Sequence, residues 1–170
     1  MTAAALSDFV SVNCAGLLGA DILEKFDFII DVPNSAIEVS VEELGHAGQS
    51  VPMEEFMVGI PIVTARIRGA DYRMFFDTGA QISYFQHESL REFPAAGNVT
   101  DFYPNFGQFE TETYNVGIAF GTSEFTLRCG VLPGLLGASL MMAGAEGIVG
   151  NQLIAGRRVG YFPRRRLLVL

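Results

Sequence analysis

Short runs of alternating apolar and polar residues fill the middle of the chain, a spacing typical of β-strands with one buried face. Turn residues separate the runs, which predicts antiparallel hairpins. One hairpin is expected where the Val- and Ile-rich stretch 56–67 is followed by turn residues 68–71 and by a strand at 72–76. Another is expected for strands at 114–120 and 124–132. The pattern therefore predicts a protein built mainly from β-strands.

Helical segments are few and short. Residues 86–93 predict a helix that ends before Pro94, because the residue preceding a proline is disfavoured in the helical region. Residues 135–143 predict a second helix, although glycines within it lower the helical propensity. The expected fold class is all-β with short helices.

Residues 99–106 and 109–114 predict a further pair of strands on either side of Gly107-Gln108. The second strand alternates glutamates with threonines, as expected for a ribbon with one exposed face. Its aromatic residues allow two interpretations: they cover a molecule bound beneath an exposed, mobile ribbon, or they point into the core of an ordinary surface hairpin. These residues are Tyr103, Phe106 and Phe109.

The chain contains an internal repeat. Residues 16–39 and 147–169 each show a Gly-apolar-apolar-Gly segment, a short helix, a strand, a turn marked by Pro and a last apolar strand. A single-position gap aligns the two copies. Residues 42–53 contain Gly, Ser and Pro with few apolar side chains, which predicts a linker. The chain is thus expected to divide into 1–41, the linker, and 54–170.

Composition and charge limit the possible functions. The 170 residues are 49% apolar, and the mean hydropathy of +0.31 is enough for one core with an appendage. The net charge of −8 is uneven, because residues 1–55 carry ten acids against Lys25 alone, while 56–170 carry nine acids and ten arginines. The two parts are expected to attract each other.

The acidic balance argues against a general nucleic-acid-binding protein. The one dense basic cluster is Arg164-Arg165-Arg166, between Pro163 and the apolar end of the sequence. We expect it to form a solvated turn; an anion site or partner patch is the alternative.

Cys14 and Cys129 are predicted to be buried reduced thiols, because the N-terminal residues show neither the basic nor the long apolar segment of an export signal. The weakly polar stretch 129–150 contains Pro133 and Glu146, and suits a packed strand, loop and helix better than a membrane span. We expect a soluble, cytoplasmic protein that does not enter a membrane.

A candidate catalytic carboxylate stands where a buried strand breaks into a Gly turn. The apolar run 74–76 leads directly into Asp77-Thr78-Gly79-Ala80. A hairpin precedes this motif, a Gly-bearing hairpin follows it, and Gly147-Ile148-Val149-Gly150 comes near the end. With these features in this order, residues 54–170 resemble a retropepsin-like aspartic protease domain of the retroviral and bacterial type.

The resemblance implies that 54–170 form one complete lobe, a closed or orthogonal β-barrel with a flap hairpin and short helices. Residues 1–41 then resemble the C-terminal half of a preceding lobe. Three explanations stay open: the C-terminal part of a longer two-lobe protein, a truncated gene start, or a native extension that packs on its own or a partner subunit. An unrelated helix-strand arm is the remaining alternative.

Peptide hydrolysis by this chemistry needs two carboxyl groups, one to activate water and one to protonate the carbonyl oxygen. Two carboxyl groups held about 3 Å apart share a proton and so divide these tasks. The chain offers one candidate, Asp77, so the second aspartate is expected from another copy in a homodimer. The resemblance implies the same arrangement, an aspartic endopeptidase acting on peptides or proteins. A fragment of a two-lobe pepsin-like protease and a non-catalytic dimerisation or peptide-binding module are the alternatives.

The resemblance also implies roles for the neighbouring residues. Thr78 would hydrogen-bond across a dimer, Gly79 would donate its N–H to the carboxylate, and Ala80 would leave room for the substrate backbone. The acidic pair that follows this Ala in the retroviral branch is replaced by Gln81-Ile82, which leaves the usual binding of substrate main chain without its carboxylate. The flap would present Tyr103, Phe106, Gly107 and Phe109 to the substrate.

Other kinds of site have weaker support. His46 and His87 lie far apart in the sequence without the ligand spacing of a zinc site, so no metal or cofactor is expected. Neither histidine lies in a motif that would activate a Ser or Cys nucleophile. Asp31 follows a strand but leads into Val32-Pro33, and is expected to be structural.

Overall fold

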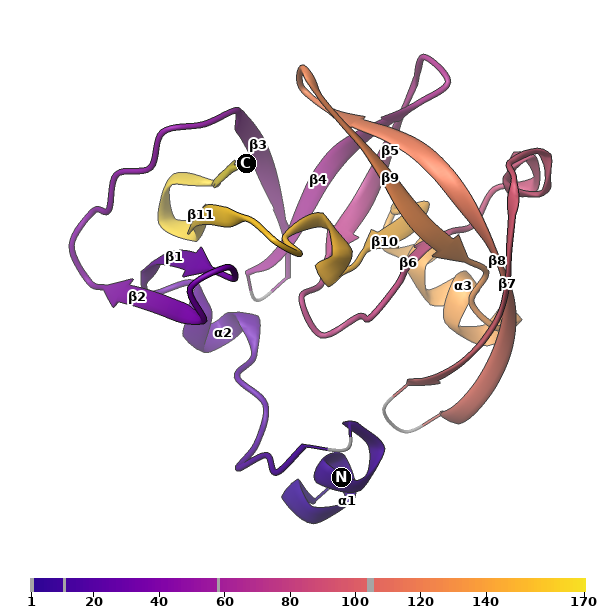
Figure 1. The fold of residues 1–170 in the computed structure, drawn as a ribbon, viewed down its shortest axis with the longest axis horizontal. Helices are drawn as coiled ribbons and strands as arrows, with labels where there is room; N and C mark the ends of the chain where they lie inside the picture. The colour runs from indigo at the N-terminus through magenta and orange to yellow at the C-terminus, as the bar shows by residue number, and fades with distance from the viewer. Residues whose placement is uncertain (1, 11, 58, 104–105) are drawn as a thin grey trace.

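The computed structural model describes residues 2–10, 12–57, 59–103 and 106–170 (Figure 1). In this part of the chain, twelve strands form one continuous sheet. They are β1 Asp27–Asp31, β2 Ala36–Ser40, β3 Ser50–Phe56, β4 Ile60–Ile67, β5 Ala70–Phe76, β6 Ser83–Phe85, β7 Ala95–Tyr103, β8 Gly107–Phe120, β9 Ser123–Gly130, β10 Gly147–Val149, β11 Arg158–Phe162 and β12 Leu167–Val169. The helices are α1 Ala3–Val10, α2 Ala20–Leu23 and α3 Gly134–Met142, with 3-10 turns η1 Glu88–Glu92, η2 Asn151–Leu153 and η3 Pro163–Arg165. The expected all-β class with short helices is confirmed.

The strand order in the sheet is β2-β1-β11-β12-β3-β4-β5-β10-β6-β9-β8-β7. A further pairing of β4 with β8, at Arg66 and Ala119, closes the strands from β4 to β8 into a ring. The fold is therefore a closed barrel, extended by a hairpin on one side and by a five-stranded flank, β2-β1-β11-β12-β3, on the other (Figure 1).

β10 lies between two strands that are consecutive in the sequence. It pairs in parallel with β5, where Val149 is opposite Phe76, and antiparallel with β6, where Ile148 is opposite Tyr84. A strand with neighbours on both sides is often buried on both faces, and every residue of β10 is buried. The connection from β5 to β6 must therefore pass over the end of β10.

The main core fills the barrel and reaches the flank. The alternating residues of β4 and β8 supply it, among them Val63, Ala65, Val116 and Ile118, each almost completely buried. Residues of α2 and β1 also pack on this core: Leu23, Phe28 and Ile30. The N-terminal hairpin and the barrel thus share one hydrophobic interior.

Three sequence-based boundaries differ from the structure. Met57 and Gly59 have positive φ values of 50° and 79°, so a tight turn divides the predicted strand 56–67 into the end of β3 and β4. The expected linker 42–53 includes the start of β3, where Val51 pairs with Leu168. These residues are strand because β12, remote in sequence, supplies the hydrogen-bonding partner.

The third difference is in the predicted flap. β7 and β8 form the expected two-stranded ribbon, but Gly107 and Gln108 are paired within β8, opposite Tyr103 and Phe102. The turn therefore precedes Gly107, and residues 104–105 lie outside the described residues. β8 then continues without interruption to Phe120 and pairs with β9 along its second half. The one long strand joins the ribbon directly to the barrel.

The N-terminal hairpin β1-β2 lies beside the C-terminal hairpin β11-β12. β1 and β11 are antiparallel, with Phe28 opposite Tyr161, Ile29 opposite Gly160 and Ile30 opposite Val159. We call the separation in sequence between Ile29 and Gly160 the repeat offset. Adding this offset to Phe28 gives Val159, which is the strand partner of Ile30. Adding it to Ile30 gives Tyr161, which is the strand partner of Phe28. The two hairpins are consequently related by a local two-fold axis at the pair Ile29–Gly160.

Backbone hydrogen bonds recur at the repeat offset. The N–H of Ile22 donates to Gly19 O at 3.1 Å, and that of Leu153 to Gly150 O at 3.2 Å. A second matching pair is formed by the N–H of Phe26, which donates to Leu23 O at 3.2 Å, and the N–H of Arg157, which donates to Ile154 O at 3.1 Å. The hairpin turns also match, at residues with φ of 50° and 52°: Ser35 and Arg166.

When the two copies are aligned at the repeat offset, as their hydrogen bonds and turns require, the gap used in the sequence alignment is no longer needed. That gap matches Pro33 with Pro163. In the turn, however, Pro163 takes the place of Val32, since Arg166 N–H bonds to Pro163 O as Ser35 N–H bonds to Val32 O. The two prolines therefore occupy neighbouring positions of the same turn, and the copies align without a gap.

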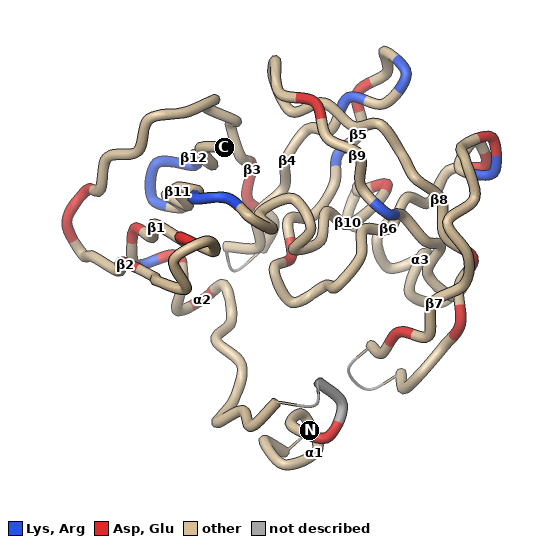
Figure 2. Tube along the Cα trace, viewed as in Figure 1, with Lys and Arg blue, Asp and Glu red and all other residues tan. Residues whose placement is uncertain are grey.

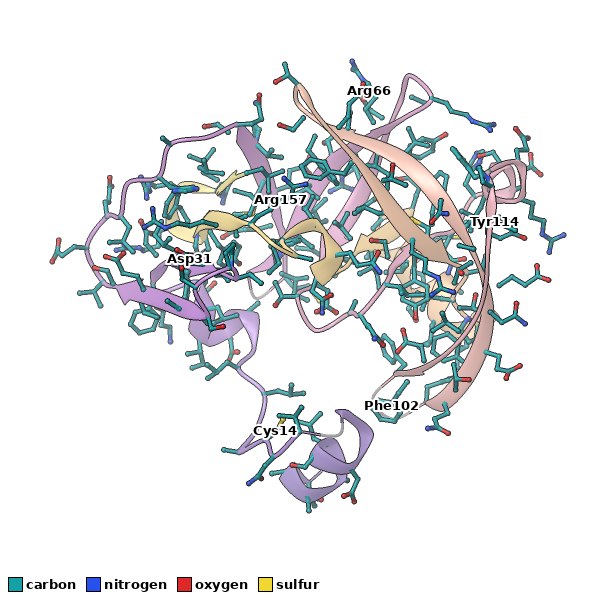
Figure 3. The ribbon with its side chains drawn as sticks, in the orientation of Figure 1. Cys14, Asp31, Arg66, Phe102, Tyr114 and Arg157 are labelled. Carbon is teal, nitrogen blue, oxygen red and sulfur yellow. The ribbon has the colours of Figure 1, made fainter. Side chains whose placement is uncertain are left out.

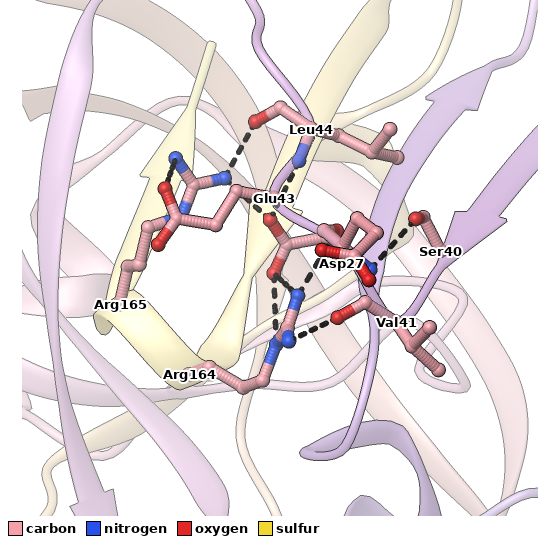
Figure 4. A network of polar contacts seen from close by, with 8 residues as sticks. Asp27, Ser40, Val41, Glu43, Leu44, Arg164 and Arg165 are labelled. Carbon is pink, nitrogen blue, oxygen red and sulfur yellow. Dashed lines mark hydrogen bonds and ion pairs between the residues drawn. The ribbon is translucent and has the colours of Figure 1, made fainter.

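A buried carboxylate fastens the two hairpins together (Figure 4). Asp27 is fully buried and accepts hydrogen bonds from Leu44 N–H at 3.0 Å and from the guanidinium groups of Arg164 and Arg165. These arginines also donate to main-chain carbonyl oxygens of residues 41, 42 and 44. The three arginines lie in an exposed turn, as expected, but Arg164 and Arg165 are also structural because they neutralise Asp27.

The expected attraction between the acidic first part and the arginines of the second is confirmed. Acidic side chains of residues 27–55 form ion pairs with arginines of 73–166: Asp27 with Arg164 and Arg165, Asp31 with Arg158, Glu43 with Arg165, Glu54 with Arg73, and Glu55 with Arg166. Figure 2 shows the basic residues of β11 and of the turn between β11 and β12 beside the acidic residues of β1 and β3. Asp31 is structural as expected, because it also accepts from the Asn34 side chain and N–H.

Cys14 and Cys129 are free thiols, as predicted, although only Cys129 is fully buried and Cys14 is half-buried. Figure 3 shows Cys14 on the segment between α1 and α2. Burial raises the pKa of the Cys129 thiol to about 12. None of the helices that the structure describes has the length and apolar character required to cross a bilayer.

Candidate functional site

Asp77 is the first residue after β5, at the point where the chain leaves the barrel to cross the end of β10. Its backbone N–H donates to Val149 O at 3.0 Å. The side chain is exposed. The structure thus combines a backbone fixed by β10 with a carboxylate that is open to solvent.

The turn folds back on the carboxylate. Gly79 N–H donates to Asp77 Oδ1 at 2.8 Å, and Ala80 N–H donates to Asp77 O at 3.2 Å. A Cβ at position 79 would lie 3.1 Å from Asp77 Oδ1, so glycine permits this close approach. The expected role of Gly79 as a donor to the carboxylate is confirmed.

The residues that follow β10 hold the loop from the other side. Asn151 N–H donates to Ala80 O at 2.8 Å, and the Asn151 side-chain amide donates to Thr78 O at 3.4 Å. Ser83 is fully buried, and its hydroxyl accepts the N–H of Gly150 at 3.1 Å. The loop is therefore bonded along its length to the chain around Gly150, and its geometry does not depend on Asp77 alone.

A small apolar cluster lies beside the loop, separate from the main core. Its buried members are Ile82, Tyr84, Leu132, Leu140 and Ile148. Ala80 from the loop, Phe109 from β8 and residues of α3 and β5 pack against it. Ile82 is almost completely buried here, which explains why this position holds no acidic side chain, since a buried unpaired carboxylate is costly.

The ribbon β7-β8 is anchored to this cluster. Tyr84 OH donates to Asp101 Oδ2 on β7, and the Tyr84 and Phe109 rings lie 6.2 Å apart, centroid to centroid. The pKa of Tyr84 is raised mainly by burial and to a smaller extent by the hydrogen bond to Asp101, so its hydroxyl stays protonated and acts as a donor. The ribbon is consequently fastened to β6, the strand that follows the Asp77 loop.

The predicted flap residues separate into two groups. Phe109 is half-buried against Tyr84, in partial agreement with the interpretation that the aromatics point inward. Tyr103 and Phe106 near the turn are exposed, at 39% and 43% of their surface. Gly107 has a φ of 98°, which a residue with a side chain rarely adopts. The two exposed aromatic rings are thus carried near the end of an anchored ribbon.

Glu110 and Glu112 are exposed while Thr111 and Thr113 are buried, so the predicted alternation of the second strand is confirmed. Thr111 Oγ1 accepts from Val131 N–H at 2.9 Å and donates to Val131 O at 3.0 Å. In Figure 1 the loop that leaves β5 and the end of the ribbon both lie toward the lower side, as does the segment between α1 and α2.

Sequence reasoning missed Asn151 and the Tyr84–Asp101 pair. Asn151 follows directly on Gly150, and a polar residue after a buried strand is a signal for a loop contact. Asp101 interrupts the ribbon strand between Thr100 and Phe102, and an acidic residue inside such a strand is a signal for a buried donor nearby.

The histidines have structural contacts. His46 Nε2 lies 3.0 Å from Arg158 O, and His87 Nδ1 accepts from Ser89 N–H at 3.2 Å at the start of η1. Within the ranges that the structure describes, no three His, Cys, Asp or Glu side chains are grouped to hold a metal ion.

No family model matches the chain, and no curated protein matches it in sequence. Among solved structures, the chain is similar to the solution structure of the simian foamy virus (mac) protease, with 12% identity and a TM-score of 0.40 over 55% of this chain and 90% of that chain. At this identity and TM-score the similarity assigns neither a family nor an activity to the chain.

Proposed function

We propose that the protein hydrolyses peptide bonds as an aspartic endopeptidase, with Asp77 as one of two paired carboxyl groups. The observation that supports this most directly is the Asp77 loop itself. An exposed carboxylate accepts the N–H of Gly79 within a turn that is bonded on its other side to the chain after β10. A carboxylate held in this way needs no rearrangement before it acts on a substrate.

Asp77 would act as general base on a water molecule while its partner, protonated, donates to the carbonyl oxygen. The apolar cluster beside the loop and the exposed rings of Tyr103 and Phe106 would contact apolar side chains of a peptide. Thr78 is exposed, which suits a contact with an opposing loop. No metal or cofactor is required by this mechanism.

The second carboxyl group must come from outside the single Asp-Thr-Gly motif of this chain. A homodimer with two Asp77 residues is the source expected from the sequence, and it stays a prediction. In the structure, β11 already has β1 on one edge and β12 on the other. A dimer joined along β11 would therefore require β1 to leave.

The test is cleavage of a library of apolar peptides at acidic to neutral pH, followed by mass spectrometry. Replacing Asp77 with Asn should lower kcat/KM by at least about 10³-fold while the fold and oligomeric state persist. The matched control is Asp71→Asn, an exposed aspartate at the other end of β5 that pairs with Arg66, and it should leave cleavage unchanged. Cleavage by Asp77→Asn at the original rate would remove Asp77 from the mechanism.

The presence of one candidate aspartate per chain also favours a second function, a non-catalytic module that binds peptides. In that case peptides bind with equal affinity to the original chain and to Asp77→Asn, and no product forms at any chain concentration. A specific activity that rises with chain concentration would instead support the homodimer.

A further inference from the structure

Two apolar segments of the N-terminal part are exposed. Leu17 and Leu18, between Gly16 and Gly19, are 68% and 72% exposed. On the outer strand β2, Ile37 is 65% exposed, and among the described residues β2 has a strand neighbour on one edge only. Exposed apolar residues on an unpaired strand edge are a surface that a partner strand can cover.

The equivalent positions at the repeat offset, near the end of the chain, are buried. Ile148 is 6% exposed, Val149 is 0% exposed, and on β12 Leu168 is 0% exposed. The backbone bonds and turns recur at the same offset, so the two sets of residues occupy equivalent places in two similar segments. The difference between them lies in what covers them.

Three strands cover the later segment. β10 is flanked by β5 and β6, and β12 is paired with β3. All three strands, and the Asp77 loop, belong to the single stretch 50–86. The exposed segments 16–19 and 36–40 thus lack one and the same unit, the front half of a barrel like this one.

We propose that Gly16–Gly19 and the free edge of β2 form a docking face for a polypeptide segment, outside residues 1–170, that presents such a front half. The docked unit would supply strands equivalent to β3, β5 and β6, with an aspartate-bearing loop between the last two. Its aspartate N–H would donate to Leu18 O, as Asp77 N–H donates to Val149 O. The docking is inferred from the comparison of equivalent residues at the repeat offset. Only the use of that aspartate as the second catalytic carboxyl group rests on the proposed function.

The glycines of the exposed segment support this occupant. A Cβ on Gly147 would lie 2.2 Å from Tyr84 O on β6, so glycine is required there by the neighbouring backbone. Gly16, its equivalent, has none of the described atoms within 4 Å of the same position, and Gly19 meets only the side chain of Asp21. Glycine at position 16 has no steric function in the described chain, but it has one if a strand docks as β6 does on β10.

A second copy of the chain does not offer the unit in a free form. Its β3 lies between β12 and β4, its β5 between β4 and β10, and its β6 between β10 and β9. Each strand already has neighbours on both edges. A copy would have to open its own barrel to dock, which costs the burial of its main core.

The probe is a fluorescent peptide with the sequence of residues 50–86, added to the full chain and followed by anisotropy. Binding is expected to slow hydrogen exchange at residues 17–18 and 36–40. Gly16→Ala and Leu18→Asp should each weaken binding at least tenfold, because the first blocks close approach and the second places a charge in the covered strand. The control Leu135→Asp, at an exposed site on α3, should bind as the original chain does.

Three results would overturn the inference: no binding, binding that Gly16→Ala and Leu18→Asp leave intact, or a dimer of the chain alone that Leu18→Asp abolishes. The second would mean that the peptide exchanges into the chain's own barrel, and the third would assign the face to a second copy. Peptide carrying Asp77→Asn should bind equally well. Binding without any cleavage would support the docking face and remove the proposed function. Cleavage that Leu18→Asp leaves unchanged would support the proposed function and remove the docked aspartate as its second carboxyl group.

Discussion

The backbone N–H of Asp77 donates to the carbonyl oxygen of Val149 at 3.0 Å. This bond joins the candidate catalytic loop to β10, a strand supplied by a much later part of the chain. Two further bonds, from Asn151 and to Ser83, fix the same junction. The position of the Asp77 carboxylate is therefore determined by how tightly β10 fits between β5 and β6.

That fit predicts opposite outcomes for two equivalent glycines. Gly147→Ala should destabilise the fold by at least about 2 kcal/mol, because its Cβ would lie 2.2 Å from Tyr84 O and 2.5 Å from Met74 Cε. Gly16→Ala, at the equivalent position of the first copy, should change stability by less than about 0.5 kcal/mol, since none of the described atoms lies within 4 Å. Urea unfolding of both variants checks this; equal losses would contradict it.

Asp27 is predicted to be the most sensitive carboxylate in the chain for stability. Asp27→Asn should cost about 3 kcal/mol, because it removes the buried charge that Arg164, Arg165 and the Leu44 N–H share. Thermal and urea unfolding measure the loss. The comparison is Asp71→Asn, which breaks an exposed ion pair with Arg66 and should cost less than about 1 kcal/mol. A loss no larger than that of the comparison would show that the buried network is not stabilising.

Tyr84→Phe should loosen the ribbon without unfolding the barrel. It removes the hydroxyl that bonds to Asp101 and leaves the ring against Phe109. Amides of β7 should then exchange at least about tenfold faster, since a hydrogen bond to a carboxylate contributes about 1.5–3 kcal/mol. Tyr114→Phe is the control, because its hydroxyl bonds to Glu112 within β8. Unchanged exchange in β7 would rule out an anchoring role for Tyr84.

The buried thiol of Cys129 predicts a loss of stability at alkaline pH. Burial raises its folded-state pKa to about 12, whereas an unfolded chain releases this proton near a pH of about 8.5. Above about pH 8.5 the contribution of this thiol lowers the free energy of unfolding by about 1.4 kcal/mol per pH unit, until the folded thiol ionises. Cys129→Ala should show a decline in stability that is shallower by about that amount over the same alkaline range. Urea unfolding under reducing conditions measures both curves, and parallel curves would contradict the prediction.

Local patterns were sufficient for much of the fold. The alternation of glutamates and threonines at 110–113 gave the exposed and buried faces of β8, and Pro94 marked the end of η1. Local patterns were not sufficient to predict the bounds of β3 and β4. The division at Gly59 is a turn between β3 and β4, where Phe56 pairs with Ile60. The start of β3 at Ser50 depends on a pairing with β12, and no residue near position 50 in the sequence carries that information.

The sequence by itself determined that Asp77 stands in a glycine turn after a buried strand, that most elements are strands, and that the residues around 16–39 and 147–169 resemble each other. Only the tertiary structure decided that β10 lies between β5 and β6, that β1 pairs with β11 symmetrically about Ile29 and Gly160, and that Arg164 and Arg165 enclose Asp27. The reason is physical: periodicity reports which face of a strand is buried, whereas the choice of neighbouring strand and the burial of a charge depend on contacts between segments far apart in the chain.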